Sequence, residues 1–161
     1  MTPEQLNNKI MIDYCYFIAT GGGVTFGGGE SLLYSEAIVE YAKIIPKEFG
    51  VTIETSMNYD GPALREVIEI TDRIIIDIKT LDELKYKAYT GMDNVKVLAN
   101  LKYLFENGYA DKCVIRIPEI PGMTTSDDTK RDEEYIRNMG FINIDRFKYV
   151  IRDYHNQVPE T

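Results

Sequence analysis

The sequence predicts one α/β domain with a mainly parallel sheet, because short β-prone segments alternate with amphipathic helical segments along its 161 residues. A second observation is the unbroken run of isoleucines at 74–76, which is typical of a strand buried on both faces. A third is a pair of glycine triplets, at 21–23 and 27–29, on either side of a β-prone run. Glycine is costly to order, so this density indicates a backbone that lies close to another group at a strand end. We expect the domain to span residues 1–152 and a frayed tail to follow at 153–161.

Five strands are expected, each followed by a turn or a helix signal. They span residues 23–26, 51–55, 73–79, 113–117 and 142–150. Pro118 and Pro121 are expected to bracket the loop that leaves the fourth strand, because proline has no N–H for a sheet ladder. Folds of this class bind ligands at the carboxyl ends of their strands, so functional residues are sought there.

The first helix has a strong start signal. Thr2 is a good N-cap, Pro3 suits the first helical position and Gln5 completes a capping box, and we expect this helix to reach Tyr14. The other helices are expected from about residue 35 to a stop or kink at Pro46, from 60–62 onward, and over 82–89, 94–107 and 128–139.

Composition excludes several classes of protein. The net charge of −8 without a basic block argues against nucleic acid or an anionic membrane as a partner. No apolar run approaches the roughly 20 residues of a membrane span, and no signal region opens the chain, so we expect a cytoplasmic protein. Cys15 and Cys113 lack metal-ligand spacing and are expected to be reduced thiols. The single histidine, His155, excludes a multi-histidine metal site within this chain.

Polar residues gather near the predicted strand ends. They are Glu30 after the first strand, Glu54 and Thr55 on the second, Asp77 and Lys79 on the third, and Arg116 inside the fourth. The turn at 27–30, which includes Gly28 and Gly29, is able to offer backbone carbonyls and the Glu30 carboxylate to a ligand ammonium group. The alternative is a glycine turn that only lets a helix pack closely. The turn has neither the lysine of a phosphate loop nor the spacing of a dinucleotide fingerprint.

Two further groups allow two interpretations each. Asp77 and Lys79 share a strand face, so Lys79 either contacts a ligand carboxylate or ribose oxygen, positioned by Asp77, or forms a structural ion pair. Arg116 interrupts an apolar strand and needs an acid partner, for which Glu54 and Asp77 are the candidates. Arg116 is therefore either part of a structural salt bridge or a clamp for a ligand carboxylate.

Taken together, these segments resemble radical S-adenosylmethionine enzymes, and within them the pyruvate formate-lyase activating enzyme group. The resemblance runs from Thr2 to about Arg152. Its motifs, in order, are GGVTFGGGE at 22–30, ETS at 54–56, DIK at 77–79, YTG at 89–91, NLKYL at 100–104, and VIRIP with IPG at 114–122. Each motif alone is short, but their collinear order is specific.

The resemblance implies a partial (β/α)6 barrel that binds S-adenosylmethionine and a [4Fe-4S] cluster and generates a glycyl radical on a partner such as pyruvate formate-lyase. By motif, Gly28, Gly29 and Glu30 receive the methionine ammonium. Glu54 and Thr55 line the cofactor pocket, Asp77 and Lys79 contact the polar ends of the cofactor, and Arg116 supports the pocket.

The sequence departs from the family pattern at several points. The three cluster cysteines, spaced CxxxCxxC, do not occur, so we expect a domain that lacks the first barrel strand and its cluster loop, and that is inactive alone. Ser31, Met57 and Val150 stand where the family has proline, glycine and often histidine. Two other interpretations therefore stay open: a non-catalytic relic or interaction module, and a sugar-phosphate barrel enzyme. A missing first strand also predicts an exposed sheet edge, either partly shielded by the first helix or used for self-association.

Overall fold

The computed structural model describes residues 1–149 and confirms the α/β class. One sheet holds five strands in the spatial order β1-β2-β3-β4-β5, and all four strand pairs are parallel. The strands are β1 (Gly23–Phe26), β2 (Gly50–Thr55), β3 (Arg73–Asp77), β4 (Cys113–Glu119) and β5 (Ile144–Lys148). Val150, His155 and the predicted tail at 153–161 lie outside the described residues.

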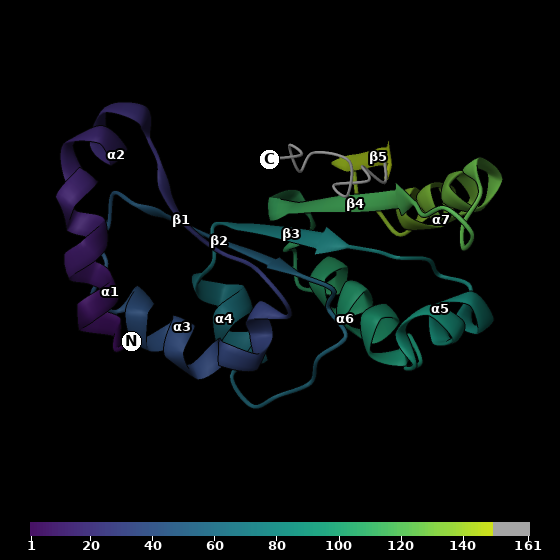
Figure 1. Ribbon diagram of the computed structural model, residues 1–161, viewed down its shortest axis with the longest axis horizontal. Helices are drawn as coiled ribbons and strands as arrows, with labels where there is room; N and C mark the ends of the chain where they lie inside the picture. Colours follow the sequence, from purple (N-terminus) through teal and green to yellow (C-terminus); the bar gives the residue numbers. More distant parts are fainter. Residues whose placement is uncertain (150–161) are drawn as a thin grey trace, which may run out of the picture.

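Seven α-helices are described within residues 1–149. They are α1 (Pro3–Ile10), α2 (Tyr14–Thr20), α3 (Ser35–Ala42), α4 (Leu64–Ile70), α5 (Glu83–Thr90), α6 (Val95–Glu106) and α7 (Ser126–Asn138). Figure 1 shows α3, α4 and α6 on one side of the sheet, while α7 packs beside β4 and β5. In this part of the chain, no helix has both the length and the hydrophobicity that crossing a membrane requires.

The two faces of the sheet differ in burial. On the face that the helices cover, Ile53, Ile74 and Ile115 are fully buried and form the core with the helix side chains. The alternate residues point to the opposite face, where Ile75 and Arg116 are only half-buried. The expectation that the isoleucine run is buried on both faces was therefore wrong for Ile75. One face of the sheet is a core, and the other is open among the described residues.

Pro118 lies inside β4, not in the loop that leaves it, so that prediction was wrong. The carbonyl of Arg116 accepts from the N–H of Ile78, which means that Pro118, two residues on, also directs its nitrogen toward β3. Strand β3 has already ended at Asp77, so the missing N–H breaks no ladder bond there. On its other side, β4 continues to pair with β5 as far as Glu119.

Several helix boundaries also differ from the sequence prediction. The capping box of Thr2 and Gln5 is present, but the first helix breaks into a 3-10 turn at Met11–Asp13 and then continues as α2 to Thr20. Helix α3 ends at Ala42, before Pro46, and α4 begins at Leu64 instead of directly after residue 60.

Strand β1 lies at the edge of the sheet, because among residues 1–149 it pairs only with β2. Helix α1 packs against α3, so its main contact is with the helix layer. Self-association through the β1 edge stays a prediction.

Candidate functional site

The glycine turn after β1 exposes its backbone. Gly28 and Gly29 have φ values of 78° and 44°, and a Cβ built on either residue meets no atom within 4 Å. Among residues 1–149, no donor reaches the carbonyl of Gly28 or Gly29. A Cβ on Gly27 would instead lie 3.3 Å from the Glu54 Oε2 atom. The turn is therefore exposed and its carbonyls are without a protein donor among these residues, so they are available to a ligand donor.

The Glu30 carboxylate holds this turn against the end of β2 through hydrogen bonds. Its Oε1 accepts from the Thr55 hydroxyl at 2.6 Å and from the Leu32 N–H at 3.1 Å. Its Oε2 accepts from the N–H and the hydroxyl of Ser56, at 3.0 and 2.6 Å. A carboxylate has about four acceptor positions, so protein donors occupy the side chain fully. The acceptors left for a ligand are the backbone carbonyls that Glu30 holds in place.

Arg116 joins the three central strands on the open face of the sheet. Its Nε and Nη2 donate to the two carboxylate oxygens of Asp77 at 2.7 and 2.9 Å, and Nη2 also donates to Glu54. Hydrogen bonds to Asp77, and then to Glu54, raise the pKa of Arg116 above its usual value, against the opposite effect of burial. The structure thus contains the structural salt bridge that the sequence left as one of two interpretations.

Lys79 lies at the margin of the Arg116 network, and Thr55 lies outside it. Lys79 follows the end of β3, and its Nζ lies 3.9 Å from Asp77 Oδ2, a much looser contact than that of Arg116. Thr55 is buried on the helix-covered face, where its hydroxyl donates to Glu30 and accepts from the Met57 N–H at 2.9 Å. Thr55 therefore holds the turn and lies on the opposite face from Glu54.

Sequence reasoning named Met57 and Asn100 through the family motifs but gave neither a role in shaping the loop after β2. Asn100 donates through Nδ2 to the carbonyls of Met57 and Tyr59, at 2.9 and 2.7 Å. Met57 is fully buried with φ of 58°, a left-handed conformation that is unusual for a side chain of this size. A signal for Asn100 did exist, because an amide inside the buried stripe of a helix needs hydrogen-bond partners.

A parallel α/β sheet with an exposed glycine turn at the carboxyl end of its first strand is typical of barrel-type domains, which bind ligands at that end of the strands. Residues 1–153 match the Radical SAM superfamily, and the chain belongs to that superfamily. The family resemblance seen in the sequence is thereby confirmed.

The matching relatives are named as activating enzymes. The (2S)-3-sulfopropanediol sulfolyase activating enzyme of Bilophila wadsworthia is 32% identical over 139 residues, which are 84% of this chain and 44% of the relative. The pyruvate formate-lyase 1-activating enzyme of Escherichia coli is 30% identical over 147 residues, covering 87% and 58%. The choline trimethylamine-lyase activating enzyme of Oleidesulfovibrio alaskensis is 35% identical over 141 residues, covering 84% and 44%. The chain spans about half the length of these relatives.

Solved structures share the fold. A crystallised domain of a pyruvate-formate lyase-activating enzyme from Bacteroides vulgatus has a TM-score of 0.55 and 19% identity, covering 80% of this chain and 99% of that domain. Streptococcus suis SuiB bound to S-adenosylmethionine has a TM-score of 0.60 and 16% identity, covering 81% of this chain and 30% of SuiB. These likenesses support the partial TIM-type barrel expected from the sequence.

The superfamily implies two bound groups, S-adenosylmethionine and a [4Fe-4S] cluster. The residues present fit only the first. The glycine cradle, which is the exposed turn after β1, fits an ammonium-bearing cofactor such as S-adenosylmethionine. For a cluster, no group of three or more potential ligand side chains gathers within residues 1–149. Cys15 is exposed, whereas Cys113 is buried and donates to the Tyr109 carbonyl. Burial raises the pKa of the Cys113 thiol to about 12, which opposes the thiolate that iron requires. The two cysteines do not fit a [4Fe-4S] cluster.

Proposed function

We propose that this chain forms the S-adenosylmethionine-binding part of an activating enzyme for a glycyl radical enzyme. The observation that carries the proposal is the exposed backbone of Gly28 and Gly29, held by a Glu30 carboxylate whose acceptor positions are all used. The names of the relatives, which are activating enzymes of pyruvate formate-lyase and choline trimethylamine-lyase, support the same class.

The cradle would receive the methionine end of the cofactor. The carbonyls of Gly28 and Gly29 accept from the ammonium group, a charge-assisted contact at a rigid site. Glu30 and Thr55 act as positioning residues, because their side chains bond each other and not a ligand. When bound and reduced, S-adenosylmethionine supplies a 5′-deoxyadenosyl radical.

The open face next to the cradle would hold the rest of the cofactor. Glu54 lies against Gly27 and lines this face, while Asp77 and Arg116 fix its floor. Lys79 is bound only loosely to Asp77, so its ammonium group remains available for a carboxylate or ribose oxygen. Each polar end of the cofactor thus meets a group of suitable charge or hydrogen-bonding type.

The proposed partner is a glycyl radical enzyme such as pyruvate formate-lyase, in the cytoplasm. The 161 residues contain only two cysteines, neither suited to the cluster, and we propose that this chain alone generates no radical. Our proposal for these residues is therefore confined to binding and orienting the cofactor.

Calorimetric titration tests the proposal with two ligands, S-adenosylmethionine and 5′-methylthioadenosine, which lacks the amino and carboxylate groups. We expect S-adenosylmethionine to bind more tightly by about tenfold, because only it has the ammonium group for the cradle, together with a carboxylate within the reach proposed for Lys79 and a sulfonium charge. Gly29→Ala strains a left-handed residue inside the cradle and should reduce this difference, by the part that the ammonium group contributes. Gly108→Ala is the matched control, because Gly108 also has a positive φ, of 76°, but ends α6.

Three outcomes decide the matter. A preference for S-adenosylmethionine that Gly29→Ala reduces and Gly108→Ala keeps supports the cradle. Equal affinity for the two ligands overturns the role of the turn. No binding of either ligand at millimolar concentration by the folded chain overturns the proposal and favours a non-catalytic interaction module.

A further inference from the structure

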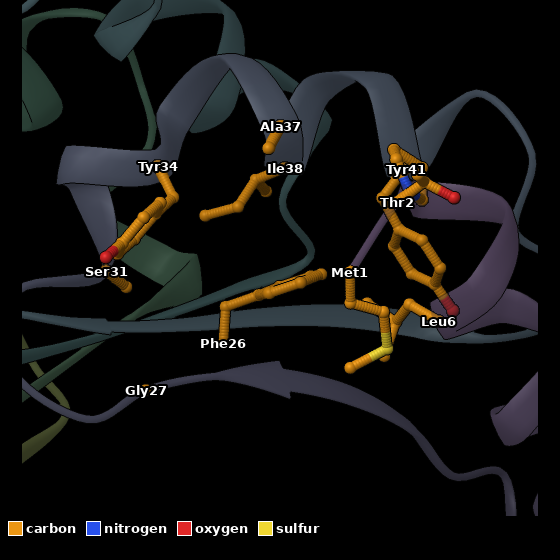
Figure 2. Close-up of a pocket in the computed structure, with 11 residues that line it drawn as sticks. Met1, Thr2, Leu6, Phe26, Gly27, Ser31, Tyr34, Ala37, Ile38 and Tyr41 are labelled. Carbon is orange, nitrogen blue, oxygen red and sulfur yellow. The ribbon is translucent and has the colours of Figure 1, made fainter.

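A cavity of about 220 Å³ lies behind the glycine turn, on the helix-covered side of the sheet. Figure 2 shows it between the end of β1, the first turn of α1 and helix α3. Phe26 forms part of its wall and is in register with Ile53, whose side chain faces the core. The cavity is therefore separate from the open face where Arg116, Asp77 and Glu54 meet.

The cavity wall is mainly apolar. Its larger side chains are those of Met1, Leu6, Phe26, Tyr34, Ile38 and Tyr41. An engineered apolar cavity of about 150 Å³ in another protein stays free of water and binds benzene. The present pocket is larger and similarly lined, but it opens to solvent beside the exposed Met1 and Tyr34, and its volume leaves room for one aromatic ring with a small substituent.

One polar group in this wall has no partner. Tyr41 is 1% exposed, and among residues 1–149 its hydroxyl makes no hydrogen bond. Buried tyrosine hydroxyls usually find a partner, so this orphan marks an unmet interaction. Burial raises the pKa of Tyr41, which keeps its O–H as a donor. In Figure 2 the Tyr41 ring runs from α3 toward Leu6, with the Met1 side chain beside it. Met1 is highly exposed and unbranched, so it can move aside for a ligand.

We propose that this cavity binds a small aromatic molecule with one hydrogen-bond acceptor, and that the Tyr41 hydroxyl donates to that acceptor. The ring would fill the apolar volume, and the acceptor would supply the missing partner. Gly27 and Ser31 belong to the wall and flank the cradle, so a bound molecule also contacts the segment that holds Gly28 and Gly29. Ser31 in addition donates to the Glu54 carbonyl at 2.8 Å, which links the wall to β2.

Amide chemical shifts of the ¹⁵N-labelled 161-residue chain test the proposal. The two probes are acetophenone and α-methylstyrene, which have the same shape but differ in a carbonyl oxygen against a CH₂ group. We expect acetophenone to bind about fivefold more tightly, since one additional hydrogen bond forms, and Tyr41→Phe to remove this preference. The shifts should map to the start of α1, to α3 and to the turn at 27–31.

A second variant tests the place of binding. Ala37 lies at the cavity on an exposed position of α3, so Ala37→Leu should fill the space without disturbing the core. Ala88→Leu makes the same change on an exposed position of α5, away from this cavity, and serves as the control. Loss of binding in Ala37→Leu alone supports the site.

Other results overturn the proposal. If neither probe binds at its solubility limit, or if Ala37→Leu leaves binding unchanged, the cavity is not a ligand site. If both probes bind equally and Tyr41→Phe changes nothing, the assigned acceptor chemistry is wrong.

Discussion

Arg116 and Asp77 are directly opposite each other on neighbouring strands, and their side chains form a two-pronged ion pair with N–O distances of 2.7 and 2.9 Å. The register of β3 and β4 makes this pair possible, because parallel partners on the same face point the same way. Glu54 on β2 adds a third member, so the network crosses the middle of the sheet. The network sets the positions of the charged groups on which the proposed cofactor site depends.

Replacing Arg116 tests how much this network contributes to the free energy of unfolding. Arg116→Lys keeps the charge but loses the planar fork, so it cannot bond both carboxylates in the same way. We expect the free energy of unfolding, measured by urea denaturation, to fall by about 1–3 kcal/mol. The control Arg137→Lys alters the pair between the exposed Arg137 and the half-buried Glu133 on α7, where Arg146 still pairs with Glu133, and should change stability by no more than about 0.5 kcal/mol. Equal losses in the two variants would contradict a special role for Arg116.

At position 57 the glycine variant should be more stable than the alanine variant, which is the reverse of the usual order. The φ of 58° at Met57 strains any residue with a Cβ, whereas glycine adopts it freely. We expect Met57→Gly to be more stable than Met57→Ala by about 0.5–1 kcal/mol in urea. Both variants should be less stable than the wild type by about 2–5 kcal/mol, because the buried side chain is lost.

Met139 provides the comparison for Met57. It caps α7 with φ of −74°, so there the alanine variant should be more stable than the glycine variant by about 0.5–1 kcal/mol. The same order at both positions would show that the backbone at Met57 is unstrained.

The sequence predicted the elements better than their ends. Alternating apolar residues such as Ile53 and Ile115 identify strands, because one buried face requires period two. The place of Pro118 depends on where the neighbouring strand β3 ends, and local sequence does not contain that information. Half-burial of Ile75 likewise depends on what covers the open face of the sheet.

The site was predictable where charge alone decides. Arg116 in an apolar strand required an acid, and both named candidates, Glu54 and Asp77, do contact it. The four donors around Glu30 were not predictable, because two come from Ser56 and one of these is a backbone N–H whose direction follows from the loop. That loop depends in turn on the left-handed Met57 and its contact with Asn100.

Asp128 should make stability depend on pH in the acid range. Hydrogen bonds from Lys85, and then from Thr125, lower the pKa of its carboxyl group. A lowered folded-state pKa contributes stability above the unfolded value of about 3.9, and this contribution is lost as pH falls through the folded value. We expect the urea midpoint of the wild type to exceed that of Asp128→Asn clearly at pH 6, and the difference to shrink below about pH 4.

Asp127→Asn is the control for this pH effect. The Asp127 side chain is 87% exposed in the same helix turn and has one ion pair, to Lys130 at 3.4 Å. The urea midpoint of the Asp127→Asn variant should stay close to that of the wild type both at pH 6 and below about pH 4. A wild-type advantage over Asp128→Asn that is constant from pH 6 to pH 2 would contradict the assignment.

Thr55→Val should loosen the glycine turn. The change keeps the shape of a buried side chain but removes the hydroxyl that donates to Glu30 and accepts from the Met57 N–H. We expect a loss of about 1–3 kcal/mol in unfolding free energy, because a buried N–H loses its partner and a carboxylate loses a donor. Hydrogen exchange of the Leu32 and Ser56 amides, which donate to the Glu30 carboxylate, should become faster, since that carboxylate then has one donor fewer to hold it in place.

The exchange result separates a local effect from a general one. Thr25→Val makes the same chemical change on an exposed position of β1, where no side-chain hydrogen bond is present among the described residues, and it should leave exchange in the turn unchanged. Amides in α6 are the internal reference for global stability in both variants. If Thr55→Val speeds exchange in α6 and in the turn by the same factor, the hydroxyl contributes only to overall stability. If the turn alone responds, the hydrogen bond between Thr55 and Glu30 determines the order of the proposed cofactor cradle.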